Sequence, residues 1–173
     1  EVYVQIRENL DGFQRELNTE KLKRIQKKVS TASPLKGTRN LSIFTPTKER
    51  AFVLDGFLEK RNALGGKQRQ YILLLSDKLL YGPSQHNLRT DVSLVQCSVY
   101  DAGEKTLIIE EKGEGKERHK FEAETSKQKD KWVDIIRTTA ASLVGKLQEE
   151  KQQRESAASL HDDDNSDGGS TPD

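Results

Sequence analysis

The chain has 173 residues, of which 32% are hydrophobic and 33% are charged, and its formal net charge is +1. Globular chains usually contain about 45–50% apolar residues, so this composition predicts one ordinary domain together with segments that are not packed. The single cysteine, Cys97, excludes an internal disulfide, and the scattered histidines form no zinc-type cluster. We therefore expect no metal, no other cofactor and a reducing, cytoplasmic location.

Charge is distributed unevenly along the chain. Residues 1–50 carry 11 Lys/Arg and 6 Asp/Glu, whereas residues 148–173 carry 2 and 8. A basic front and an acidic tail indicate separate segments rather than one evenly charged globule.

Residues 2–29 are predicted to form a long helix. Apolar residues recur at steps of three and four, with one five-residue step in the middle that predicts a bend: Ile6, Leu10, Phe13, Leu17, Leu22, Ile25 and Val29. The stripe has no evident partner in this chain, so we expect it to pack against something upstream. A free amphipathic or coiled-coil helix is the alternative.

Residues 31–50 are predicted to be a linker, because Ser-Pro, Lys-Gly and Thr-Pro pairs interrupt any periodicity. Ser33-Pro34 and Thr45-Pro46 fit proline-directed phosphorylation, although such pairs are common in loops.

From Phe52 the pattern becomes strand-like. Short apolar or alternating runs are separated by Gly, Asp or Asn, and they predict strands at 52–60, 70–75, 79–81, 88–95, 96–101, 105–111 and 118–124. Gly65-Gly66 marks the first turn. Seven short strands linked by tight turns favour an antiparallel sandwich or barrel.

A terminal helix follows the strands. Thr125 and Gln128 fit a capping box, and an apolar stripe then recurs at helical spacing: Trp132, Ile135, Ile136, Thr139, Leu143 and Leu147. Trp132 is predicted to plug the open end of the sheet, although an ordinary core tryptophan would fit the same spacing. Residues 148–173 are predicted to extend the helix to about residue 158 and then to form an acidic, disordered tail.

Three motifs together resemble a pleckstrin homology (PH) domain over residues 51–147. They are Gly56-x-Leu58-x-Lys60, the run from Tyr71 to Asp77-x-Leu79-Leu80-Tyr81, and the helix tryptophan Trp132. The resemblance implies a mainly β fold with α: a seven-stranded antiparallel PH-type sandwich or barrel capped by a C-terminal helix, with the long N-terminal helix added.

The segment from Asp11 to Lys28 resembles the last helix of a Dbl homology (DH) domain over residues 1–30. Residues 50–58 are similar to the entry into the PH domain that follows such a domain, and residues 61–75 resemble the faciogenital-dysplasia type. This implies a Rho-family guanine nucleotide exchange factor that regulates the cytoskeleton and contacts its Rho-family GTPase through the missing upstream domain. The fragment itself is then no enzyme but the regulatory, membrane-facing part.

The resemblance also implies a lipid site at the first hairpin. PH domains that bind phosphoinositides use basic residues at the end of the first strand and along the second, because phosphate requires several charge-assisted bonds. The candidates here are Lys60, Arg61, Lys67, Arg69 and Tyr81.

The motif is only half present, since Tyr71 falls where tight binders place the key arginine. We expect weak, poorly selective binding to phosphoinositides or another anionic membrane surface, at the inner face of the plasma membrane. The alternative for these charges is that they merely solvate a hairpin.

Other motifs fail on inspection. Gly66-Lys67 lacks the glycine and the hydroxyl residue of a phosphate loop, and Asp163-x-Asn165 opens a calcium loop that the chain does not complete. No catalytic set stands at interpretable spacing. The strand region is nearly neutral, which argues against nucleic acid. A protein-interaction PH-like module, making a GTPase, cytoskeletal or autoinhibitory contact, remains the alternative function.

Overall fold

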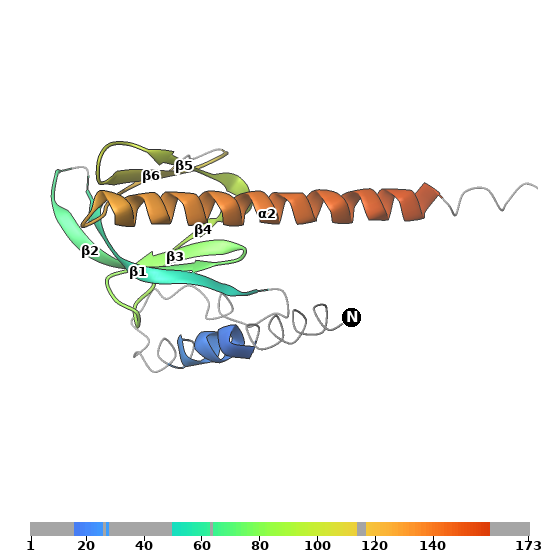
Figure 1. Ribbon diagram of the computed structural model, residues 1–173, viewed down its shortest axis with the longest axis horizontal. Helices are drawn as coiled ribbons and strands as arrows, with labels where there is room; N and C mark the ends of the chain where they lie inside the picture. The colour runs from blue at the N-terminus through green and yellow to red at the C-terminus, as the bar shows by residue number, and fades with distance from the viewer. Residues whose placement is uncertain (1–15, 26, 28–49, 63, 114–116, 160–173) are drawn as a thin grey trace, which may run out of the picture.

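The computed structural model describes residues 16–25, 27, 50–62, 64–113 and 117–159 (Figure 1). Its strands are β1 (Phe52–Arg61), β2 (Lys67–Leu75), β3 (Lys78–Gly82), β4 (Thr90–Ser93), β5 (Cys97–Asp101), β6 (Thr106–Glu111) and β7 (Arg118–Glu122). A 3-10 turn, η2 (Leu94–Gln96), precedes β5, and the helix α2 (Ser126–Ser159) follows β7. All seven predicted strands and the terminal helix are confirmed.

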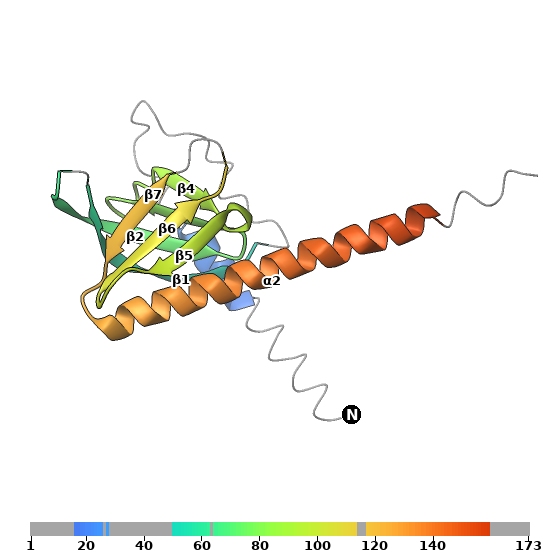
Figure 2. The ribbon, with the colours of Figure 1, turned by 90° about the horizontal axis from the view of Figure 1, so that it is seen from above.

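The seven strands form one antiparallel sheet in the order β4-β3-β2-β1-β7-β6-β5. β1 joins the two halves of this sheet: it pairs with β2 along its whole length and with β7 only at Glu59 and Lys60. Figure 2 shows the two halves folded toward each other, with α2 crossing beside them. The strand β1 therefore brings the β1–β2 hairpin and the end of β7 to the same place.

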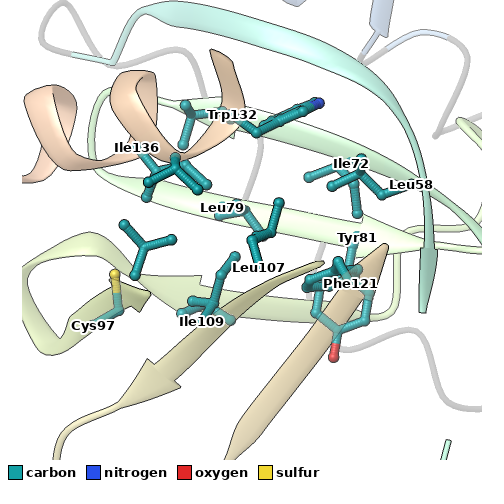
Figure 3. Packing of buried hydrophobic residues seen from close by; sticks show 14 of the residues in the cluster. Leu58, Ile72, Leu79, Tyr81, Cys97, Leu107, Ile109, Phe121, Trp132 and Ile136 are labelled. Carbon is teal, nitrogen blue, oxygen red and sulfur yellow. The ribbon is translucent and has the colours of Figure 1, made fainter. Parts of the chain in front are cut away.

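The main core lies between the two halves of the sheet and α2. Trp132 is 3% exposed and belongs with Ile136 to a cluster of residues from both halves, among them Leu79 of β3 and Leu107 of β6 (Figure 3). A Cβ at Gly56 would lie 3.3 Å from the Trp132 ring, so a glycine lets the ring approach β1 closely. The predicted burial of Trp132 is confirmed.

The start of α2 is fixed by side-chain hydrogen bonds. The backbone N–H of Gln128 donates to Thr125 Oγ1 over 3.1 Å. The Gln128 side-chain Oε1 accepts from the backbone N–H of Glu124 over 2.8 Å, whereas in the expected capping box it would accept from Thr125, one residue later. Lys129 bonds Asp101 Oδ2 at 2.6 Å. This bond holds the pKa of the Asp101 carboxyl below its ordinary value and that of Lys129 above its own, and it ties the helix to β5.

A second core lies on the opposite side of β2. Residues 16–25 are helical, and Leu22 and Ile25 pack there against Tyr71 and three leucines, Leu73, Leu75 and Leu80. Figure 1 shows these helical residues and α2 on opposite sides of the sheet. β2 is buried on both faces, which explains why its sequence from Tyr71 to Leu75 is continuously apolar rather than alternating.

This second core corrects one expectation and leaves others open. Leu22 and Ile25 find their partners within this chain rather than upstream, because both lie on the face of the helix that the sheet covers. Apart from residue 27, which is helical, the rest of the predicted 2–29 helix lies outside the described residues, as do nearly all of the 31–50 linker and the acidic tail beyond residue 159.

Candidate functional site

The β1–β2 hairpin presents the predicted basic residues. Its register pairs Arg61 with Lys67, Lys60 with Gln68 and Glu59 with Arg69. The turn is closed by the Gly66 amide, which donates to Asn62 Oδ1 over 2.6 Å, and Gly65 takes a φ of 82° that favours glycine. Leu64, at the tip of this turn, is 96% exposed. An apolar side chain is thus presented between Arg61 and Lys67.

Strand alternation divides the candidates between two faces of the hairpin. Arg61, Lys67 and Arg69 lie on the outer face, the face that farther along carries Tyr71 and the second core. Lys60 points to the other face, where Tyr81 also lies. The structure therefore brings three candidates together on one side and two on the other.

On the outer face, Glu122 at the end of β7 joins two of the cations. Arg61 Nε donates to Glu122 Oε2 over 2.7 Å, and Lys67 Nζ donates to Glu122 Oε1 over 2.9 Å. Lys67 also lies 3.4 Å from Glu59. The hydrogen bond between Lys67 and Glu122 raises the pKa of the lysine and, with a further contribution from Arg61, lowers that of the carboxyl. An anion that binds here must replace an internal carboxylate.

Arg69 borders a hollow beside this ion-paired group. Its guanidinium lies 4.3 Å from the centroid of the Phe57 ring, in cation–π geometry. The hollow has a volume of about 290 Å³ and is lined by charged residues of both signs and three apolar ones: Glu59, Arg69, Lys105, Glu122, Glu124, Phe57, Leu58 and Ala123. It suits a ligand with both positive and negative groups better than a simple polyanion.

On the inner face, Lys60 is held by a chain of side chains, of which Tyr81 and His119 are buried. Lys60 Nζ donates to the Tyr81 hydroxyl over 2.6 Å and lies 4.5 Å from the centroid of the Tyr81 ring. The same hydroxyl is 3.0 Å from His119 Nδ1, and His119 Nε2 is 2.9 Å from Glu111 Oε1. His119 is only 1% exposed. Tyr81 was predicted to contribute to the site, whereas His119 and Glu111 were missed.

Glu111, Glu117 and His119 have ligand atoms within 4.8 Å of one another, a spacing that a metal ion could use. Both ring nitrogens of His119 already have hydrogen-bond partners, Tyr81 and Glu111. These hydrogen bonds account for the cluster, so we assign no metal site within the described part of the chain.

Tyr71, which the resemblance to PH domains places at the arginine position of tight binders, is part of the second core. Its hydroxyl donates to Asp55 Oδ2 over 2.7 Å and accepts from Gln85 Nε2 over 3.1 Å. Burial, and then the hydrogen bond to Asp55, raise the pKa of Tyr71. Because the side chain is 3% exposed, it contributes to the fold rather than to a headgroup pocket.

Comparison with known proteins identifies the fold. No protein-family model and no curated protein sequence matches the chain. Among solved structures, the DH/PH fragment of PDZRHOGEF in complex with human RhoA is 17% identical, with a TM-score of 0.61, over 75% of this chain and 40% of that chain. An N-terminally truncated linker-DH/PH structure of p115-RhoGEF is 20% identical, with a TM-score of 0.59, over 75% of this chain and 41% of that chain.

These likenesses show that the chain adopts the PH fold, as it occurs in the DH/PH fragments of Rho exchange factors. The chain spans about two fifths of the length of those fragments. Within the ranges that the structure describes, no helix is both long enough and apolar enough to cross a membrane.

Proposed function

We propose that this chain is the regulatory, membrane-facing PH module of a Rho-family guanine nucleotide exchange factor. It binds phosphoinositides or an anionic membrane surface weakly and positions the exchange domain. Its location is cytoplasmic and peripheral, at the inner face of the plasma membrane. The GTPase is contacted through the upstream domain, and residues 1–173 do not catalyse exchange by themselves.

The observation that carries this proposal is the helix docked on the outer face of β2. Leu22 and Ile25 form a continuous apolar core with the PH sheet. Residues 52–159 make up less than two thirds of the chain, so a 75% match to DH/PH fragments also includes residues outside that range. Both facts support residues 1–30 as the last helix of an exchange domain, followed by a linker at 31–50, a PH domain at 51–147 and an extension at 148–173.

The membrane part of the proposal depends on the hairpin. Four basic side chains surround a turn whose tip exposes Leu64, so cations could meet phosphates while an apolar group enters the interface. The affinity is low, because Glu122 and Glu59 already bind Arg61 and Lys67 and because Tyr71 fills the position of the missing arginine.

Liposome co-sedimentation at about 0.15 M salt tests this role, since exposed charges are then screened beyond about 8 Å. The wild type should bind anionic vesicles more than neutral ones, and Lys67→Glu with Arg69→Glu should abolish the difference. The matched control is Lys151→Glu with Arg154→Glu, which makes the same change of charge far along α2 on exposed side chains. Binding that survives the hairpin substitutions, or that the control abolishes equally, would place the site elsewhere.

A protein-interaction module is the second candidate. The mixed charges of the hollow beside Arg69 favour it, since three carboxylates there would repel a polyphosphate headgroup. On this alternative the wild type should bind no anionic vesicle above the neutral background.

A further inference from the structure

Lys60, Tyr81, His119 and Glu111 form one hydrogen-bonded chain drawn from four strands, β1, β3, β7 and β6. The chain begins at the hairpin, where Lys60 is a candidate headgroup contact, and leads inward to a histidine that is 1% exposed. The Tyr81 ring is held in place by edge-to-face packing on Phe121, with ring centroids 5.3 Å apart. The protonation state of His119 can therefore affect Lys60 through one hydroxyl group, that of Tyr81.

The positions of the protons follow from what each group can donate. The Lys60 ammonium has only donors, so the Tyr81 oxygen must accept its bond. The Tyr81 hydroxyl then donates its own proton to His119 Nδ1, and the remaining ring nitrogen, Nε2, carries a proton and donates it to Glu111. Every member is satisfied when the imidazole is neutral.

A proton added to His119 breaks this order. Nδ1 then becomes a donor, so the Tyr81 oxygen faces two donors, the imidazolium and the Lys60 ammonium, and its own proton must turn away. Two positive charges would lie on either side of one hydroxyl oxygen in a partly buried place, where their repulsion is weakly screened. Glu111 at 2.9 Å and Glu117 at 4.0 Å stabilise the charge on His119, whereas no ion pair holds Lys60 among the described residues, where its other contact is the Tyr81 ring.

We propose that His119 is a positioning residue for Lys60: the neutral imidazole keeps Lys60 on Tyr81, and protonation releases the lysine to an anionic headgroup. The groups that face the histidine are Glu111 and Glu117 on the β6–β7 side, Tyr81 on β3 and, through Tyr81, Lys60 on β1. Because the anion favours the released lysine, anion binding and protonation reinforce each other. The proposal rests on the proposed function in taking Lys60 as a lipid contact.

The first experiment measures binding to vesicles of phosphatidylcholine and phosphatidylserine at about pH 7.5 and about pH 5.5, on either side of the range in which histidines ordinarily titrate. Phosphatidylserine is chosen because phosphate monoesters titrate near pH 6 and would obscure the result. One additional lysine near an anionic surface corresponds to about a fivefold gain, so the wild type should bind about fivefold more tightly at the lower pH.

Three variants make the prediction specific. His119→Gln stays neutral and should lose the gain, whereas His86→Gln, at an exposed histidine, should keep it. Tyr81→Phe removes the hydroxyl that couples His119 to Lys60 and keeps the ring that lies 4.5 Å from the ammonium, so binding should no longer differ between the two pH values. A gain that persists in folded His119→Gln, or a Tyr81→Phe protein that still needs low pH, would overturn the proposal; the second variant keeps the test decisive if the first does not fold.

A second measurement separates this inference from the membrane proposal. Nitrogen-15 NMR of the protein without vesicles follows the Lys60 ammonium and the His119 ring during a pH titration. The Lys60 signal should change with the His119 titration in the wild type and not in His119→Gln. Failure to bind vesicles at any pH would refute the membrane role while this coupling remained, whereas a Lys60 signal that is indifferent to His119 would refute the inference itself.

Discussion

Truncation of Ile25 to alanine tests whether the N-terminal helix is truly part of the PH module. Ile25 is 3% exposed in the second core, against Tyr71 and the leucines of β2 and β3. Truncating a buried isoleucine usually costs about 2–5 kcal/mol, because transfer energy is lost and a cavity remains. A helix that is held by few buried side chains can instead detach from the sheet. The stability lost in Ile25→Ala therefore cannot exceed the free energy with which the helix packs on the sheet. We therefore expect about 2 kcal/mol, at the lower end of that range.

Urea unfolding and hydrogen exchange measure this effect together. The midpoint should fall in Ile25→Ala, and amides of residues 16–25 and of β2 should exchange faster, because detachment uncovers Leu73 and Leu75. Leu17→Ala is the matched control, since Leu17 is on the same helix but 50% exposed, and its cost should stay within about 0.5 kcal/mol.

Equal, small effects of Ile25→Ala and Leu17→Ala would refute the second core. They would mean that the helix lies beside the sheet without being stabilised by it. The proposed positioning of an upstream exchange domain would then have no structural basis.

Four further results are expected. Trp132→Ala should destabilise the protein by about 3–5 kcal/mol in thermal or urea unfolding, and a loss below about 1 kcal/mol would contradict its role as the plug of the main core. Residues 1–173 should not accelerate the release of a fluorescent nucleotide from Rho-family GTPases, and acceleration above buffer would show that the fragment holds an exchange surface. Glu122→Gln should strengthen binding to anionic vesicles, because it frees Arg61 and Lys67 from a full carboxylate charge; unchanged or weaker binding would count against the outer-face site. Asp101 has a lowered pKa through Lys129, so its contribution to stability is complete above the ordinary value of 3.8 and lost as pH falls below it. Lowering the pH below 3.8 should therefore reduce the free energy of unfolding more in the wild type than in Lys129→Met. Parallel curves of unfolding free energy against pH for the two proteins would refute this linkage.

The sequence predicts the strands and the terminal helix well because local signals define them. Gly65 and Gly66 mark a tight turn, Thr125 and Gln128 mark a helix start, and Trp132 recurs on one face with Ile136. These features depend on neighbours within a few residues. Local chemistry and tertiary packing agree there, as they do in most natural domains.

The candidate site was predicted only in part, because its partners come from distant strands. Lys60 and Arg61 are adjacent in sequence, yet the alternation of β1 sends their side chains to opposite faces, and the pairing of β1 with β2 decides which residues join each of them there. Glu122 and His119 reach the hairpin only because β7 pairs with the end of β1. Alternation of His119 with Phe121 is a signal that could have placed the histidine inside, but nothing local connects it to Lys60.

On the proposed membrane role, these partners limit how tightly the hairpin can bind. Four basic side chains near an anionic surface would contribute about 4 kcal/mol, which corresponds to a millimolar dissociation constant. Each of the four already has a partner in the free protein: Tyr81, Glu122 or the Phe57 ring. A headgroup gains only the difference between the new contact and the old one, so the millimolar figure is an upper limit on affinity. Such a hairpin cannot recruit a protein alone, but it can act once another contact holds the protein at the membrane, because the second binding event then occurs at a high effective concentration. On the proposed function, the helix docked through Leu22 and Ile25 would be the rigid connection that this requires, since a loosely attached module would dilute that advantage.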